Sequence, residues 1–332
     1  MIPKKISIAN TPTPIHKMDR LSEELKKNIY IKRDDFTGME WSGNKIRKLE
    51  FAVKEALDQK CSVLITCGGT QSNHARATVA FARKLGLKVH LVLRGNAPDS
   101  LEGNMLLNEL MGTAITWLDF EAFKYHEEVM KELGLKYAGE GKKAYIIPIG
   151  ASNGIGNFGY YDCFNEILKQ ESDMNIHFDT IVCTVGSGGT YSGLMLGQLL
   201  NKTDHSIIGF NISNTSEYFK GVISEILSDS LDLIDEKSIK SQYSRDDIFI
   251  IDGYAGDGYA ISRNEELEFI LEIAQTEGII FDPVYTGKAF RGLVDQIKRG
   301  NFEKSENILF IHTGGIFGAF SFENQIRTVL EK

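Results

Sequence analysis

The chain has 332 residues, of which 42% are hydrophobic and 25% charged, and its formal net charge is −8. This composition is typical of a soluble globular protein of about two domains and excludes a disordered chain. The acidic net charge argues against nucleic-acid binding. No apolar run approaches the roughly 18 residues of a membrane span, and no apolar stretch of a signal peptide follows Met1–Lys5. We therefore expect a cytoplasmic protein without a signal peptide.

Short β-branched runs alternate with amphipathic stretches, and most runs are apolar on consecutive positions, as strands buried on both faces are. The predicted strands, in chain order, are Ile29–Lys32, Val63–Thr66, Val89–Leu93, Ala114–Trp117, Ala144–Ile147, Thr180–Val185, Ile207–Asn211, Ile248–Ile251, Ile279–Asp282 and Ile308–His312. One helix is marked at both ends, by a capping box of Ser262 and Glu265 and by Gly278 as its stop. The alternation predicts an α/β fold with parallel sheets.

Two glycine-containing crossings divide the chain. Residues 150–159 hold four glycines directly after an apolar strand, and a second crossing is predicted near residues 43–48. We therefore predict a small domain over residues 49–151 and a large domain over residues 1–48 and 152–332. A cleft between two such domains is a preferred site for a small ligand.

The cysteines and histidines show no metal-binding or disulfide pattern. The four cysteines, Cys61, Cys67, Cys163 and Cys183, form no C-x-x-C pair, so we expect buried thiols in a reducing compartment. The seven histidines are scattered and lack the clustered spacing of a zinc site, so no metal is predicted.

Lys45 stands at a predicted helix start, marked by Gly43 and Asn44. The positive end of the helix dipole, together with Arg47 and Lys48, disfavours an ammonium at Lys45. A lysine of lowered pKa suits a Schiff base, because only the free amine attacks a carbonyl. Lys48 lies one turn further on, where it could meet a phosphate. A basic, solvated first turn would explain the same residues.

A glycine-rich turn, Gly186–Thr190, lies between the strand Thr180–Val185 and a helix. Glycines there let backbone N–H groups converge on an anion. The turn is not a dinucleotide fingerprint, because Tyr191 stands where a glycine is needed and the next strand ends in Asn211 rather than an acid. It also lacks the G-K-[ST] of a P-loop. The turn predicts a phosphate cradle, although a merely tight turn has the same composition.

Three further segments follow predicted strands. Cys67–His74 gathers hydroxyl, amide and imidazole groups at a helix start, which suits a small carboxylate. Phe281–Lys288 and His312–Gly315 follow two late strands, and the carboxyl ends of parallel strands face the ligand crevice. Turn chemistry around a buried tyrosine would explain these last two equally well.

Two catalytic motifs compete with this interpretation. Ser42-x-x-Lys45 matches a β-lactamase signature whose companion motifs are missing. Gly150-x-Ser152-x-Gly154 matches a hydrolase nucleophile elbow, and Asp282 and His312 could complete a triad. A serine hydrolase using Ser152 and a two-domain amino-acid-binding protein are therefore the alternatives from other classes.

Taken together, these segments resemble the D-cysteine desulfhydrase / 1-aminocyclopropane-1-carboxylate deaminase group of fold type II (tryptophan synthase β-like) pyridoxal phosphate enzymes. The matching stretches run in family order over nearly the whole chain: IKRDD (31–35), SGNKIRKLEF (42–51), TQSNHAR (70–76), IPIGASNGIGNFGY (147–160), VGSGGTYSG (185–193), YAGDGYAIS (254–262), FDPVYTGKA (281–289) and ILFIHTGG (308–315). The resemblance implies a two-lobed α/β homodimer, each lobe a mostly parallel sheet flanked by helices, with pyridoxal 5'-phosphate as cofactor and an amino acid as substrate. It also assigns the Ser152 motif to the loop that crosses between the lobes.

The resemblance implies roles for the matching residues. Lys45 is similar to the Schiff-base lysine and to the base that removes the α-proton. The residues implied in cofactor binding are Lys45, Lys48, Asn73, Gly186, Ser187, Gly188, Gly189, Thr190 and Thr313. Those implied at the substrate are Ser72, Asn73, His74, Tyr259 and Tyr285, and the deaminases have Gln in place of His74. Ser72, Tyr259 and Tyr285 are expected to act in catalysis with Lys45.

Two threonines bear on the branch within this group. The deaminases carry Glu at the position of Thr286 and Leu at that of Thr313. A carboxylate beside the pyridine nitrogen makes the ring a stronger electron sink, whereas a threonine only shares a hydrogen bond with it. We therefore expect α,β-elimination from D-cysteine to pyruvate, ammonia and hydrogen sulfide. Deamination of 1-aminocyclopropane-1-carboxylate stays an alternative. Residues 316–318 depart from the family pattern, so a lyase reaction on D-serine or cysteate stays open as well.

Overall fold

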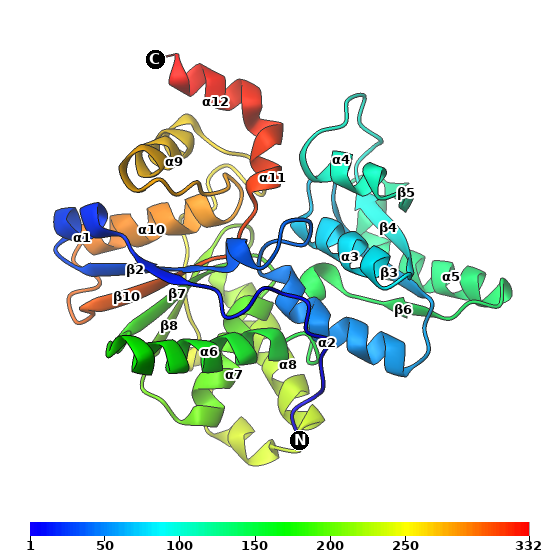
Figure 1. Cartoon of the computed structure of the whole chain (residues 1–332), viewed down its shortest axis with the longest axis horizontal. Helices are drawn as coiled ribbons and strands as arrows, with labels where there is room; N and C mark the ends of the chain where they lie inside the picture. The colour runs from blue at the N-terminus through cyan, green and yellow to red at the C-terminus, as the bar shows by residue number, and fades with distance from the viewer. Residues whose placement is uncertain (332) are drawn as a thin grey trace.

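The computed structural model describes residues 1–331, and its ten strands form two separate sheets (Figure 1). The larger sheet has the order β1-β2-β10-β7-β8-β9 and is parallel except for β1, while the smaller sheet, β5-β4-β3-β6, is parallel throughout. The strands are β1 (Ile15–Lys17), β2 (Asn28–Arg33), β3 (Val63–Gly69), β4 (Lys88–Arg94), β5 (Ala114–Leu118), β6 (Ala144–Ile146), β7 (Thr180–Val185), β8 (Ser206–Asn211), β9 (Phe249–Ile251) and β10 (Asn307–His312).

Helices cover both faces of each sheet (Figure 1). The α-helices are α1 (Asp19–Leu25), α2 (Lys45–Asp58), α3 (Asn73–Lys84), α4 (Gly103–Leu110), α5 (His126–Gly139), α6 (Phe158–Met174), α7 (Gly189–Asn201), α8 (Ser216–Leu233), α9 (Asn264–Glu277), α10 (Thr286–Lys298), α11 (Ile316–Ala319) and α12 (Glu323–Leu330). This architecture confirms the predicted α/β class with parallel sheets flanked by helices.

The larger sheet packs against α6, α7 and α8 on one face and α1, α9 and α10 on the other (Figure 1). Side chains alternate between these faces: Ile181 and Cys183 of β7 join the α6–α8 side, and Val182 joins the opposite side. Because both faces are buried, the strand is apolar at consecutive positions, which is why its limits could be predicted.

The smaller sheet alternates in the same way. Leu64 of β3 packs toward α2 and α3, whereas Val63 and Ile65 pack toward α5. Strands β3 to β6 all fall within residues 49–151, the predicted small domain. The precise boundaries at residues 48 and 152 stay a prediction.

Helix α2 lies between the two sheets and contacts both α3 and α6 (Figure 1). It approaches α6 very closely at Gly159, where an added Cβ would lie 2.5 Å from the carbonyl oxygen of Arg47. On its other side, the buried Arg76 of α3 donates to the backbone oxygens of Glu40 and Ser42, just before α2 begins. These contacts fix the start of α2 relative to both sheets.

The predicted strand Ile279–Asp282 is wrong. Phe281 is buried against Phe290 and Phe310, which explains the apolar run, but the backbone pairs with no neighbouring strand and its Ile280 carbonyl contacts the imidazole of His312. The short edge strand β1 was not predicted, because only one of its three residues is hydrophobic.

The capping box predicted at Ser262 and Glu265 is displaced by one residue. Arg263 N donates to Glu266 Oε2 at 3.0 Å, while Ser262 Oγ donates to the Pro283 carbonyl. Gly278 does end α9, in the left-handed conformation with φ of 67°.

All four cysteines are buried and free, in agreement with the prediction. Burial raises the pKa of each of these thiols. Within residues 1–331, no helix combines the length and the apolar character needed to cross a membrane.

Candidate active site

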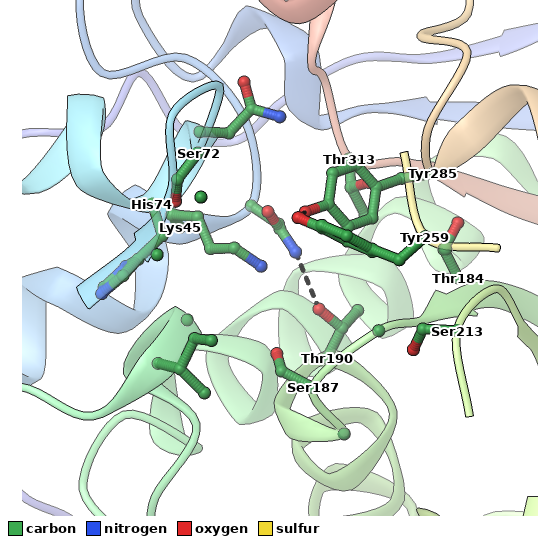
Figure 2. Close-up of a pocket in the computed structure, with 18 of the residues that line it drawn as sticks. Lys45, Ser72, His74, Thr184, Ser187, Thr190, Ser213, Tyr259, Tyr285 and Thr313 are labelled. Carbon is green, nitrogen blue, oxygen red and sulfur yellow. Dashed lines mark hydrogen bonds between the residues drawn. The ribbon is translucent and has the colours of Figure 1, made fainter. Parts of the chain in front are cut away.

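A cavity of about 250 Å³ lies where the carboxyl ends of the two sheets face each other (Figure 2). It is lined by Asn44, Lys45, Gly68, Gly69, Ser72, Asn73, His74, Arg94, Phe123, Ile149, Gly150, Thr184, Gly186, Ser187, Gly188, Thr190, Ser213, Tyr259, Tyr285, Thr313 and Gly314. Its walls therefore come from segments that follow β3, β4, β7 and β10, as expected for parallel sheets. The lining holds lysine and arginine but no aspartate or glutamate.

Lys45 is the first residue of α2, and its side chain extends into the cavity toward Tyr259 and Tyr285 (Figure 2). Burial lowers the pKa of Lys45 to about 8, and the Asp282 carboxylate opposes part of this shift. The cause differs from the one predicted: desolvation acts on Lys45, and Arg47 faces elsewhere. A substantial fraction of the amine is neutral near pH 7–8, as a covalent or basic role requires.

Arg47 lies on the face of α2 turned toward the large sheet, where its charge is fully paired. Its guanidinium donates to Asp34 Oδ2 at 2.9 Å and to Glu166 Oε2 at 2.9 Å. Lys32 pairs with the same Glu166, and the Tyr160 hydroxyl donates to Asp34 at 2.6 Å. Burial alone would raise the pKa of Asp34, but Arg47 holds it below its usual range.

Lys48 is fully buried beside the glycine-rich turn, next to the cavity but outside its lining. Its Nζ donates to Ser152 Oγ at 3.0 Å, and Ser152 Oγ shares a hydrogen bond of 2.9 Å with Ser187 Oγ. Burial and the charge of Lys45 hold the pKa of Lys48 well below its ordinary value. Between residues 1 and 331, no carboxylate forms an ion pair with Lys48.

The turn after β7 brings α7 close to Lys48. Gly188 caps α7 with φ of 80°, and a Cβ on Gly189 would lie 2.6 Å from Ser152 Oγ and 3.0 Å from Lys48 Nζ. Thr190 accepts a hydrogen bond of 2.9 Å from Asn44 Nδ2 (Figure 2). A helix start, two hydroxyl groups and an unpaired cation together form a site that fits a phosphate group.

The start of α3 forms another wall. Ser72 caps the helix by accepting from Ala75 N at 3.1 Å, and Asn73 Oδ1 accepts from Asn104 Nδ2 at 2.9 Å. His74 is buried, its Nε2 shares a hydrogen bond of 2.8 Å with Thr66 Oγ1, and its ring points away from the two tyrosines in Figure 2. Burial holds the pKa of His74 far below its ordinary value, so the imidazole is neutral. A direct role of His74 at the substrate stays a prediction.

Tyr259 and Tyr285 face Lys45 from the opposite side (Figure 2). Their hydroxyl groups are hydrogen-bonded, and their rings meet edge to face with centroids 5.8 Å apart. Burial raises the pKa of both phenols, so both remain protonated at neutral pH.

The two threonines that we compared with the deaminases have different surroundings. Thr313 lines the cavity, but Thr286 is fully buried and outside its lining. Thr286 Oγ1 donates to Asp282 Oδ1 at 2.6 Å, and Asp282 Oδ2 also accepts from Tyr285 N at 2.8 Å. Asp282 thus caps α10, and Thr286 supports that cap.

The serine hydrolase alternative fails on geometry. Ser152 Oγ is engaged by Lys48 and Ser187, and the nitrogens of His312 contact Gly314 N and the Ile280 carbonyl instead. No Ser152–His312–Asp282 triad is formed.

Arg94 is the main cavity residue that the sequence analysis missed. It ends β4 directly opposite Gly69 of β3. A basic residue at the carboxyl end of a predicted buried strand was the available signal, but it belongs to no motif.

Folding also brings together three possible metal ligands that are scattered in the sequence. One atom each of Glu171, His177 and His205 lies within 4.8 Å of the others, at the start of β7 and β8 and so at the strand ends opposite the cavity. The two buried members of this group, Glu171 and His205, are hydrogen-bonded to each other, with 2.9 Å between Glu171 Oε1 and His205 Nε2. This hydrogen bond explains their proximity without a metal ion.

Comparison with known proteins agrees with this geometry. A family model described as "Pyridoxal-phosphate dependent enzyme" matches residues 6–314. A putative 1-aminocyclopropane-1-carboxylate deaminase of Thermotoga maritima is 43% identical over 320 residues, covering 96% of this chain and 98% of that protein. The mitochondrial bifunctional D-cysteine desulfhydrase/1-aminocyclopropane-1-carboxylate deaminase of Arabidopsis thaliana is 38% identical, with 98% and 81% covered. The D-cysteine desulfhydrase of Serratia proteamaculans is 36% identical, with 97% of each chain covered.

Solved structures give the same picture. The crystal structure of an ACC deaminase homologue superposes with a TM-score of 0.90 at 37% identity, covering 99% of this chain and 96% of that chain. A fungal L-serine ammonia-lyase from Rhizomucor miehei shares the fold, with a TM-score of 0.69 at 16% identity and 99% of each chain covered.

Proposed function

Because this chain belongs to the pyridoxal-phosphate dependent enzymes of fold type II, we propose that it catalyses α,β-elimination from a small β-substituted amino acid, D-cysteine first. The products would be pyruvate, ammonia and hydrogen sulfide. Relatives of 36–43% identity carry both the deaminase and the desulfhydrase name, so family membership establishes a lyase dependent on pyridoxal phosphate, and the substrate has to be argued from the site.

The observation that carries the proposal is a buried amine of lowered pKa opposite an unpaired cation in a glycine-rich cradle. Lys45 would hold the cofactor covalently, and Lys48 with the Gly186–Thr190 turn would hold its phosphate. When bound, the cofactor supplies a carbonyl for the substrate amine and a ring that withdraws electrons. Asn73 and Thr313, which both line the cavity, are proposed to contact that ring.

The side chains around the cavity suit the proton transfers of an elimination. Once free of the cofactor, Lys45 Nζ would take the α-proton, because the lowered pKa leaves part of this amine neutral near pH 7–8. Ser72 and Asn73, at the start of α3, would hold the substrate carboxylate. The protonated hydroxyl pair of Tyr259 and Tyr285 would orient the β-substituent.

A second candidate is deamination of 1-aminocyclopropane-1-carboxylate, which the names of several relatives favour. That substrate has no α-proton, so opening its ring demands a stronger electron sink. The cavity lining contains no carboxylate, and Thr286, which stands where the deaminases have Glu, is buried against Asp282. This arrangement supports elimination as the main activity.

A substrate screen of the cofactor-loaded enzyme tests the choice. We expect sulfide and pyruvate from D-cysteine, and slower or no 2-oxobutyrate from 1-aminocyclopropane-1-carboxylate. L-cysteine, D-serine and both enantiomers of cysteate complete the panel. Release of 2-oxobutyrate at a rate comparable with the best β-substituted amino acid would make the deaminase the better assignment.

A further inference from the structure

Arg94 reaches into the cavity from the end of β4 and is surrounded by aromatic rings. Its guanidinium carbon lies 5.2 Å from the ring centre of Phe120, 5.7 Å from that of Phe123 and 5.5 Å from that of Tyr259. Guanidinium groups stack favourably on aromatic faces, so the three rings hold the side chain in one place. Phe120 and Phe123 belong to the small-sheet part, whereas Tyr259 carries one of the two hydroxyl groups that face Lys45.

The charge of Arg94 has no counterpart in the protein. Over residues 1–331 no carboxylate lies within ion-pair distance of it, and the cavity lining supplies none either. The chain is nevertheless acidic, with 45 aspartates and glutamates against 37 lysines and arginines. Arg47, in contrast, forms ion pairs with two acidic side chains, Asp34 and Glu166. An unpaired guanidinium in a cavity has hydrogen-bond donors available for an anion.

The anionic groups of the proposed reaction already have other partners. The phosphate has Lys48 and the start of α7, and the α-carboxylate has the start of α3. Arg94 is therefore a third positive feature of the cavity, beside the tyrosine that would face the β-carbon. A guanidinium binds carboxylate or sulfonate through two parallel hydrogen bonds.

We propose that Arg94 forms an anion-binding subsite that selects amino acids whose β-substituent carries a negative charge in the bound state, such as a sulfonate or a carboxylate, or becomes an anion as it leaves, as cysteine sulfur does when it departs as hydrosulfide. The inference rests on the proposed function and names its substrate class. In the elimination, the α-proton goes to Lys45, the Cα–Cβ double bond forms, and the bond from Cβ to sulfur breaks with its electron pair on sulfur, so a sulfonate leaves as sulfite and a thiol as hydrosulfide. A carboxylate cannot leave in this way, so aspartate would bind without being turned over. Arg94 would stabilise that departing charge as well as the bound substituent.

Paired inhibitors of equal size test the proposal on the cofactor-loaded enzyme. Aspartate and asparagine differ mainly by the charge on the β-substituent, and neither is a good substrate for elimination. We expect aspartate, in the enantiomer the enzyme accepts, to bind at least about tenfold more tightly than asparagine, which corresponds to about 1.4 kcal/mol. In Arg94→Gln this preference should fall to about one, and in Arg94→Lys it should partly remain.

Alanine separates this role from binding of the α-carboxylate, because it has no β-charge. Its inhibition constant should be the same in wild type and Arg94→Gln. A matched control is Arg83→Gln, since Arg83 in the same part of the chain lies outside the cavity lining and donates to the carbonyls of Met111 and Gly112. Arg83→Gln should keep the preference for aspartate.

Three results would overturn the proposal: no preference for aspartate in wild type, an unchanged preference in Arg94→Gln, or equal weakening of all three ligands in that variant. Equal weakening would assign Arg94 to the α-carboxylate. The proposed function fails separately, if no β-substituted amino acid is turned over. Cofactor absorbance and melting temperature of Arg94→Gln show whether the variant is folded and loaded.

Discussion

Helix α2 carries buried cations on two faces, and the faces differ in how their charge is balanced. On one face Arg47 is paired with Asp34 and Glu166, and Lys32 and Tyr160 complete a network in which each charge has a partner. On the other face Lys45 lines the cavity and Lys48 lies beside it against Ser152, and within residues 1–331 neither lysine forms an ion pair with an acidic side chain. The paired face positions the helix, whereas the unpaired face leaves positive charge for an anionic ligand.

The largest expected effect comes from removing the cavity amine. Lys45→Ala should lower turnover by about a thousandfold or more, because the variant loses both the covalent link and the base. Visible absorbance and peptide mapping after borohydride reduction would report the link in wild type. A pyridoxyl group found on a different lysine would contradict the assignment.

Breaking the paired face should affect stability instead. Asp34→Ala leaves Arg47 with one acid fewer in a buried site, and we expect a loss of about 3–5 kcal/mol in the free energy of unfolding. Denaturant unfolding of the cofactor-free protein measures it. The control Glu121→Ala breaks an exposed pair with Lys124 and should change stability by less than about 1 kcal/mol. If Asp34→Ala and Glu121→Ala changed the free energy of unfolding equally, the paired face of α2 would have no special role in stability.

The unpaired lysine Lys45 should also give stability a characteristic pH dependence. Its pKa is about 8 in the folded chain, below the 10.5 of an exposed lysine, so between these values the unfolded chain binds more protons. The stability of the cofactor-free protein should therefore rise with pH across this window, by about 3 kcal/mol from Lys45 alone. The measured quantity is the difference between wild type and Lys45→Met, which cancels the groups that Lys45 does not affect; Lys48 and His74, whose pKa values the charge of Lys45 lowers, are compared in the double variant Lys45→Met with Lys48→Met. A flat or falling difference would mean that the amine is not desolvated.

The smallest effect is expected at Lys48. Lys48→Met should weaken cofactor binding by about 10- to 100-fold, because one charge-assisted contact to the phosphate is lost. The cofactor-free variant should be as stable as wild type or more so, since a buried amine without an acidic partner is replaced by an apolar side chain. Lys54→Met, on the exposed surface of the same helix, is the control and should bind cofactor normally. Cofactor titration with a visible readout and unfolding of the cofactor-free protein together decide the matter.

Sequence patterns predicted the elements that are governed by local burial. Consecutive apolar residues located β7 to the residue, and the glycine-rich turn after it was placed correctly. The same rule failed at Ile279–Asp282, because Phe281 is buried by packing and not by strand pairing. A run of apolar residues predicts that a segment is buried. It does not predict whether a paired strand or packed side chains bury it.

The cavity was predictable where residues belong to motifs and hidden where they depend on distant contacts. Lys45 and Gly186–Thr190 belong to short contiguous segments. Arg94 acquires its place only through the pairing of β4 with β3, and Thr286 turns to Asp282 because that carboxylate caps α10. The direction in which each of these side chains points is set by tertiary packing, and the spacing of residues along the chain does not predict it.

Gly159 of α6 lies outside the cavity lining, yet any larger residue there would strike the backbone of α2 at Arg47 and Lys48. A methyl group at this position must displace α2, the helix that carries Lys45 and Lys48. The substitution should therefore lower the stability of the protein and also move both lysine side chains from their positions at the cavity. In a saturation mutagenesis library selected for activity, position 159 should thus tolerate substitution almost as poorly as position 45. Selection for the reaction therefore acts also on position 159, where the absence of a Cβ atom lets α2 and α6 pack closely enough to place both lysines.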